Sequence, residues 1–487
     1  MAEFMIANMA PLMFGALVLF LLFGYPVAFA LAANGIVFGL VGIELGLLTP
    51  ALFQALPERI FGIMANDTLL AIPFFTFMGL ILERSGMAED LLDTIGQLFG
   101  PIRGGLAFAV IFVGALLAAT TGVVAASVIS MGLISLPIML RYGYDKRLAS
   151  GVIAASGTLA QIIPPSLVLI IMADQLGRSV GDMYEGAMVP GLVLTSLYVG
   201  YVALLAVFKP ATCPALPPEA RTLRGAKLLL RVITTLVPPL VLIFLVLGTI
   251  FLGIATPTEG GAMGAAGALI LAIARQRLSF KLLKQAMETT GKLSSFVVFI
   301  LVGSTVFGLV FRGVNGDLWV EHLLLSLPGG QVGFLIVVNI LVFVLAFFLD
   351  FFELSFIIVP LLAPVADKLG IDLVWFGVLL AVNMQTSFMH PPFGFALFYL
   401  RSVAPASVKT TDIYWGAIPF VCIQILMVAI IIIFPNIVSY GDPAEKARIE
   451  QQGEVDLSTM MQDGDATQAP TEDSAADLLK NLQSENK

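Results

Sequence analysis

The sequence predicts an all-α polytopic membrane protein built from two inverted-topology repeats, with about ten crossings and two re-entrant hairpins. Of the 487 residues, 59% are hydrophobic and only 12% are charged, and the mean hydropathy is +0.98. These values lie outside the range of soluble proteins. Apolar runs of roughly 20 residues, enough to cross a bilayer core about 30 Å thick, recur along the chain. An internal duplication, described next, supplies the repeat.

The duplicated stretch runs from Pro137 to Pro165 and returns 227 residues later as Pro364 to Pro392 without a gap. Six of its 29 aligned positions are identical, where composition alone would give about two. Each copy ends at a proline pair, which removes two backbone donors and clashes with the preceding turn, so a helix must open there. Opened backbone at membrane depth survives only inside protein or beside a wet cavity. Paired breaks of this kind therefore indicate the binding site of a transporter.

The first repeat, 4–208, is expected to contain five crossings and one hairpin. Pro26 is tolerated at a helix start and opens the second span. Leu91, Leu92 and Ile95 share one face of an amphipathic helix that would lie along the membrane surface. The hairpin is too long for one crossing and is interrupted at 119–122. In order, the expected elements are a span 4–24, a span 26–41, a span 68–82, a surface helix 87–99, the hairpin 106–140, a Pro-opened span 148–173 and a span 188–208.

A Pro-rich linker, 209–231, carries five bases and leads into the second repeat, 232–435. The second repeat follows the same plan, and its hairpin has its tip at 349–353. Its expected elements are a span 232–252, a Pro-opened span 257–274, a basic loop to 292, a span 293–311, an amphipathic piece 318–327, the hairpin 333–366, a Pro-opened span 373–400 and a span 414–434. The acidic tail, 440–487, has few large apolar residues and is expected to be disordered.

The charges support an inverted arrangement. Five crossings per half is an odd number, so the second half must enter the membrane from the opposite side. With both termini outside, the inner loops hold 17 Lys and Arg residues and the outer loops hold 4. This asymmetry is what the positive-inside rule requires.

Polar residues near the hairpin tips and proline pairs are the candidate ligands of a hard cation such as sodium, which binds oxygen. Burying a carboxylate in an apolar membrane segment costs free energy, so such a residue usually has a function. Asp350 is such a residue. The alternative is that small polar residues only let membrane helices pack closely. The candidate sodium ligands are Thr120, Thr121, Gly122, Ser156, Gly157, Thr158, Asp350, Asn383 and Thr386.

The proline pairs themselves, with the polar residues beside them, are the candidate substrate site. Amides and the positive end of each reopened helix favour an anionic group there. A histidine beside the second pair could bind a carboxylate, titrate, or only hydrogen-bond an orphan carbonyl. The candidate substrate residues are Gln161, Pro164, Pro165, Ser166, His390, Pro391 and Pro392.

Other classes of function are disfavoured by what the chain lacks. Cys213 and Cys422 lie far apart and indicate neither a disulfide framework nor a metal cluster. The chain has no basic patch of the kind that binds nucleic acid, so a nucleic-acid partner is not expected. Two histidines without a nucleophile motif offer no catalytic set, so an enzyme is not expected. A channel would need a continuous polar pore, which these spans do not provide.

Four ordered motifs resemble the large membrane subunit of the tripartite ATP-independent periplasmic (TRAP) transporters: 161–166, 255–260, 348–350 and 391–394. The resemblance covers about 12–434. It implies sodium-coupled uptake of an organic acid across the bacterial inner membrane by an elevator mechanism, with no cofactor beyond sodium ions. It also implies two partners besides membrane lipid: a small membrane subunit and a periplasmic solute-binding protein. The alternative is a stand-alone anion or carboxylate transporter or channel without a binding protein.

Overall fold

A computed structural model describes residues 2–121, 124–347, 349–392 and 394–441, and in these ranges the secondary structure is helical, without a β-strand. The chain divides into two units, Met1–Ser439 and Tyr440–Lys487. All helices of the described residues lie in the first unit. The predicted disordered tail lies, beyond its first two residues, outside the described residues.

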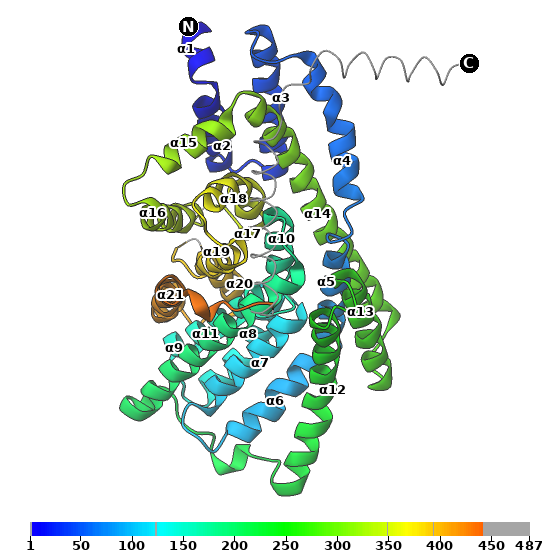
Figure 1. The fold of residues 1–487 in the computed structure, drawn as a ribbon. Coiled ribbons are helices and arrows are strands. Elements are labelled where there is room, and N and C mark those ends of the chain that lie inside the picture. Colours follow the sequence, from blue (N-terminus) through cyan, green and yellow to red (C-terminus); the bar gives the residue numbers. More distant parts are fainter. Residues whose placement is uncertain (1, 122–123, 348, 393, 442–487) are drawn as a thin grey trace, which may run out of the picture. The chain divides into compact units, whose positions relative to one another are not determined.

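The helices of the first unit are arranged in two groups that also pack against each other, through α5 and α6 on α7 and through α15 on α18 (Figure 1). In the frame, α3 packs against α14 and α5 against α13; in the hairpin bundle, α9 packs against α21 and α10 against α19. The frame consists of α1 (Ala2–Ala7), α2 (Met9–Leu22), α3 (Val27–Glu44), α4 (Leu56–Met64), α5 (Ala71–Arg84), α6 (Met87–Phe99), α12 (Gly225–Phe251), α13 (Pro257–Ala274), α14 (Phe280–Gly313) and α15 (Gly316–Leu325). The hairpin bundle consists of α7 (Gly105–Thr121), α8 (Val124–Arg141), α9 (Lys146–Thr158), α10 (Leu167–Leu176), α11 (Val180–Phe208), α16 (Gly330–Leu345), α17 (Phe351–Ile357), α18 (Val359–Lys368), α19 (Leu373–Ser387), α20 (Phe395–Val403) and α21 (Thr410–Ile433). Each group therefore draws helices from both halves of the sequence.

The duplicated stretch folds locally in the same way twice. Gly143 and Gly370 end α8 and α18 with φ of +82° and +70°, a conformation that favours glycine. Asp145 then accepts hydrogen bonds from two N–H groups of α9, and Asp372 accepts one, of 2.7 Å, from the Trp375 N–H in α19. Both aspartates are N-caps, which supply acceptors to the otherwise unpaired first turn of a helix. The same chemistry thus starts α9 and α19.

Both predicted helix openings are present at the proline pairs. After α9, the peptide bond between Pro164 and Pro165 is cis, and α10 begins only at Leu167. After α19, the bond between Pro391 and Pro392 is also cis, and α20 begins at Phe395. Each break leaves backbone groups without helical partners inside the hairpin bundle.

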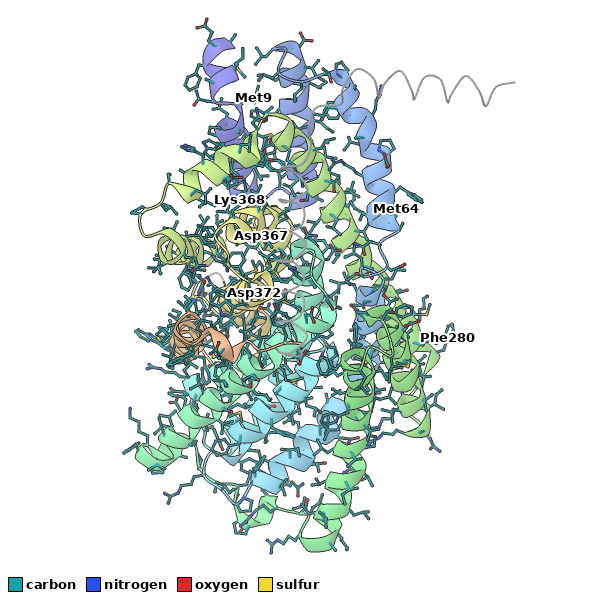
Figure 2. The ribbon with its side chains drawn as sticks, viewed as in Figure 1. Met9, Met64, Phe280, Asp367, Lys368 and Asp372 are labelled. Atoms are coloured by element: carbon teal, nitrogen blue, oxygen red, sulfur yellow. The ribbon has the colours of Figure 1, made fainter. Side chains whose placement is uncertain are left out.

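The turn between α18 and α19 is polar, with Asp367, Lys368 and Asp372 close together (Figure 2). Lys368 Nζ lies 2.6 Å from Glu321 Oε1 on α15, which joins the hairpin bundle to the frame. The two side chains are 54% and 22% exposed, and exposed pairs contribute only about 0–1 kcal/mol. This ion pair therefore holds the two groups together weakly.

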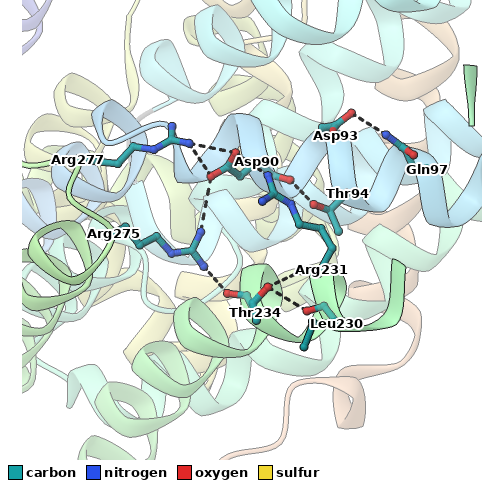
Figure 3. Close-up of polar contacts among 9 residues, drawn as sticks. All are labelled: Asp90, Asp93, Thr94, Gln97, Leu230, Arg231, Thr234, Arg275 and Arg277. Carbon is teal, nitrogen blue, oxygen red and sulfur yellow. Dashed lines mark hydrogen bonds and ion pairs between the residues drawn. The ribbon is translucent and has the colours of Figure 1, made fainter. Parts of the chain in front are cut away.

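Within the frame, Asp90 on α6 ties the two halves of the chain together (Figure 3). Its carboxylate lies 3.2 Å from Arg231 on α12, 3.6 Å from Arg275 and 3.1 Å from Arg277. Arg275 also donates to the backbone carbonyl of Thr234. Because one carboxylate faces three guanidinium groups, α6 is held against the start of the second half by charge as well as by apolar contact.

Several loops predicted from charge are helical in the structure. The basic segment before 293 and the span after it form one helix, α14, of 34 residues, capped by Ser279. The linker 209–231 ends early, because α12 already begins at Gly225. The segment between the predicted spans 26–41 and 68–82 contains α4. Lys, Arg and Gln are good helix formers, so charge alone ends a membrane span without ending its helix.

Six helices of the described residues are individually long and apolar enough to cross a membrane, or seven if the bent pair α15 and α16 counts as one span. The helices broken at proline pairs are too short to qualify one by one, as are α2 and α5, which have 14 residues each. The ten crossings and two hairpins therefore remain a prediction.

Candidate functional site

A cavity of about 310 Å³ lies where the two halves of the hairpin bundle meet α14. The start of α8, the first break, the start of α17 and α20 all contribute to its wall. Its lining residues are Val124, Ala125, Gln161, Leu167, Val168, Leu293, Phe296, Asp350, Phe351, Phe352, Phe388, Phe395 and Tyr399. Two predicted site residues, Gln161 and Asp350, thus share one cavity although they come from different repeats.

Three predicted sodium ligands of the first repeat, Ser156, Gly157 and Thr158, lie at the end of α9, which packs against α7 and α8. A Cβ on Gly114 of α7 would lie 2.5 Å from the Ser156 Cβ, and a Cβ on Gly157 would lie 2.3 Å from Val128 of α8. The Ser156 hydroxyl is buried and has no hydrogen-bond partner, so its oxygen is free for a ligand. Thr120 and Thr121 end α7, but their side chains lie outside the described residues, as does Gly122 entirely.

Thr158 contacts its own counterpart in the second repeat. Gln385 lies 227 residues later, the offset of the duplication, and its Nε2 donates to Thr158 Oγ1 over 3.1 Å. The same oxygen accepts from Gln424 Nε2 at 3.3 Å and donates to the Ala155 carbonyl at 2.8 Å. Gln424 also donates to the Tyr198 hydroxyl at 2.9 Å. In this arrangement the Thr158 hydroxyl uses both of its acceptor positions within the protein.

The predicted ligands of the second repeat are held in a similar way. Asn383 Nδ2 donates to the carbonyl and to the side-chain oxygen of Asn339, both at 2.9 Å, and so ties α19 to α16. The Thr386 hydroxyl donates to the Asn383 carbonyl at 2.6 Å. Asn383 and Thr386 are buried but do not line the cavity described above.

Asp350 is both the N-cap of α17 and a cavity residue. Its Oδ1 accepts from the Glu353 N–H, and its own N–H donates to Glu353 Oε2, each over 2.9 Å. This reciprocal capping box fixes the start of α17. The structure therefore gives Asp350 a local structural role in addition to its predicted role toward a cation.

Among the predicted substrate residues, Gln161 lines the cavity, and its Oε1 is buried without a partner. Ser166 supports the break: its hydroxyl donates to the Gln161 carbonyl at 2.7 Å and accepts from the Val168 N–H. His390 is 1% exposed and lies against Phe343 and Phe347, with ring centroids 4.0 and 4.5 Å away. Neither of its ring nitrogens has a hydrogen-bond partner.

The four prolines shape the breaks, and none of them, nor Ser166 or His390, is part of the cavity lining. The sequence predicted none of the other lining residues, which are aliphatic or aromatic; the aromatic ones are Phe296, Phe351, Phe352, Phe388, Phe395 and Tyr399. In an apolar chain a phenylalanine carries no signal of function, so only the fold could reveal them. No group of three His, Cys, Asp or Glu able to hold a metal was found in the described ranges.

Replacing Thr158 by Val and Gln385 by Leu together should cost less stability than the two single changes summed. Thr158, Gln385 and Gln424 are all buried, so removing one side chain leaves the amide or hydroxyl of its partner unsatisfied. We expect a coupling of about 1 kcal/mol in a double-mutant cycle measured by unfolding in SDS. As a control, Thr76→Val combined with Gln385→Leu should be additive, because the buried Thr76 hydroxyl has no partner. Additivity in both cycles would contradict the contact between repeats.

Residues 14–437 match the family described as "Tripartite ATP-independent periplasmic transporter, DctM component". The chain belongs to this family. As a DctM-family chain it is a permease subunit of a TRAP transporter and a multi-pass protein of the inner membrane, as the sequence predicted. The prediction of a transport protein rather than an enzyme is confirmed, because its relatives are permeases.

Several relatives show which functions similar chains have. The DctM-family chain is 30% identical over 434 residues to the C4-dicarboxylate TRAP transporter large permease protein DctM of Vibrio cholerae, covering 85% of this chain and 92% of that one. It is 28% identical to the isethionate TRAP transporter permease protein DctMQ of Oleidesulfovibrio alaskensis, covering 82% and 61%. It is 26% identical to the sialic acid TRAP transporter permease protein SiaT of Haemophilus influenzae, covering 80% and 62%.

The fold is also found in a solved structure. The YdaH transporter of Alcanivorax borkumensis superposes on this DctM-family chain with a TM-score of 0.56 at 14% identity, covering 85% of this chain and 97% of that chain. The predicted all-α membrane transporter fold is therefore confirmed.

Proposed function

We propose that this permease couples the entry of an organic acid to the entry of sodium, using the cavity between the two repeats. The observation that carries the proposal is the polarity of that cavity: its lining includes Asp350 and an unpaired Gln161 oxygen but, among the described residues, no Lys, Arg or His. An organic anion placed beside a carboxylate in low dielectric is repelled. A sodium ion bound with it removes this penalty, so the anion and the cation bind better together than apart.

The two-group architecture supports an elevator mechanism. Both breaks and most of the cavity wall belong to the hairpin bundle, so the bundle can carry the cavity as one body along the frame. The contact between Thr158 and Gln385, at the duplication offset, is where an axis relating two inverted repeats would pass. The Lys368–Glu321 ion pair between the bundle and α15 adds little to the barrier against such a movement.

We infer the two partners from the family: a small membrane subunit and a periplasmic binding protein that delivers the acid. The chain spans 61% and 62% of the length of the isethionate and sialic acid permeases that it matches. No nucleic acid takes part, and lipid surrounds the exposed apolar faces.

Reconstitution tests the proposal. Proteoliposomes containing the permease and its small subunit, with the binding protein and a radiolabelled organic acid outside, should accumulate the acid only with an inward sodium gradient. Replacing sodium by potassium, or omitting the binding protein, should abolish accumulation. Uptake that ignores the sodium gradient would refute the coupling, and uptake that ignores the binding protein would refute the tripartite arrangement.

A further inference from the structure

We propose that the substrate is a monoanionic acid with a single aromatic ring or an apolar body of similar size, in contrast to the C4-dicarboxylates named for the Vibrio cholerae relative. This inference rests on the proposed function, because it assumes that the cavity between the repeats is the substrate site. It is carried by the side chains of the cavity wall, their arrangement and the cavity's size.

The wall is aromatic on several sides. Phe296 comes from α14, Phe352 from the start of α17, and Phe388, Phe395 and Tyr399 from the second break and α20. The Phe296 and Phe352 rings lie edge to face, with centroids 5.9 Å apart, and Phe388 and Phe395 are 5.8 Å apart. The rings of these pairs come from separate segments of the chain and line the same cavity. An aromatic guest is favoured by each ring that it meets, beyond the burial of its surface.

The polar part of the wall suits one charge. Besides Asp350, the polar side chains in the lining are the Gln161 amide and the Tyr399 hydroxyl, both neutral. A single carboxylate can be compensated by a co-transported cation and these two dipoles. A second carboxylate would be buried without a partner in the cavity that Asp350 lines, at the high cost of an unpaired charge in an apolar environment. The lining therefore discriminates against dicarboxylates.

The aliphatic residues and the volume set the size. Leu167, Val168 and Leu293 close the remaining wall with apolar surface that offers no hydrogen bond to a hydroxylated chain. At about 310 Å³ the cavity is near the lower end of the range for small-molecule sites, which is roughly 300–1,000 Å³. A single ring bearing one carboxylate fits this combination better than a larger sugar acid.

The test is direct binding to the purified permease with its small subunit in nanodiscs, without the binding protein, so that only the permease selects the ligand. Benzoate, succinate and N-acetylneuraminate are titrated by calorimetry in sodium chloride and in potassium chloride. We expect benzoate to bind only with sodium and at least tenfold more tightly than the other two. Sodium-dependent binding of succinate or N-acetylneuraminate in preference to benzoate overturns this inference but leaves the proposed coupling intact. Absence of any sodium-dependent binding overturns both.

Substitutions locate the binding. Phe352 is only partly buried, so Phe352→Ala should fold and should weaken benzoate binding about tenfold, with Phe352→Leu intermediate. Phe244→Ala is the matched control, since Phe244 is 69% exposed on α12 and does not line the cavity. Equal affinity of Phe352→Ala and the parent protein for benzoate contradicts an aromatic site in this cavity.

Discussion

Asp350→Asn should raise the sodium concentration for half-maximal uptake at least about tenfold without unfolding α17. Asparagine caps a helix about as well as aspartate does, so the capping box with Glu353 keeps its acceptor while the negative charge is lost. An interaction with a charged group is worth about 1.5–3 kcal/mol, and each 1.4 kcal/mol is tenfold in an equilibrium constant. Uptake measured against sodium in proteoliposomes, normalised to folded protein, gives the shift.

Asp350→Ala separates the two roles of this residue. It removes the cap as well as the charge, which should lower thermal stability by a further 0.5–2 kcal/mol or so, in addition to the loss of sodium affinity. If Asp350→Asn leaves the sodium dependence unchanged while Asp350→Ala lowers only stability, Asp350 is a cap and not a cation ligand.

Gly151→Ala should destabilise the folded protein by about 1–3 kcal/mol, because α9 and α21 cross with their backbones in contact. A Cβ at Gly151 would lie 2.1 Å from the Gly416 carbonyl oxygen, and one at Gly416 would lie 2.1 Å from the Arg147 carbonyl oxygen. Backbone cannot turn aside as a side chain can, so the helices must move apart. The melting temperature of the detergent-solubilised protein measures the loss.

Gly200→Ala is the matched control for this change. Gly200 lies within α11, and a Cβ added there would have no neighbouring atom within 4 Å, so the methyl group meets open space. Alanine is a better helix former than glycine by up to about 1 kcal/mol, so this variant should be as stable as the parent or more so. Equal melting temperatures for Gly151→Ala and Gly200→Ala would show that the crossing of α9 and α21 tolerates a side chain.

What the sequence could predict depended on local chemistry. The pairs Pro164–Pro165 and Pro391–Pro392 open their helices, as proline's missing donor predicts, whereas α12 continues through Pro238 and Pro239. A proline pair alone therefore does not decide where a helix opens. The spacing of Leu91, Leu92 and Ile95 predicted a surface helix at 87–99, and α6 has these bounds. α13 has the bounds of the predicted Pro-opened span 257–274, and the structure adds a capping box of Thr256 and Glu259 at its start.

What the sequence could not predict depended on distant packing. Nothing in the local sequence indicated that the amide of Gln385 reaches Thr158. The aromatic lining was missed because Phe296 and Phe388 look like any other apolar residue of a membrane span. Conversely, the charges before 293 were interpreted as a loop although the helix continues through them as α14. The predicted sodium ligands stay predictions, since the structure fixes where most of them lie but not what they bind.

The division of both groups of helices between the two halves of the sequence has a consequence for biosynthesis. The ribosome delivers α5, α9 and α10 long before their packing partners α13, α21 and α19 exist. Contacts so far apart in sequence form late and slowly. Until then the nascent first half exposes to lipid polar side chains such as Ser156 and Thr158, which are fully buried at the end. An insertion factor or membrane chaperone that shields this surface should therefore associate with ribosomes paused after 208 and leave once α21 has been inserted.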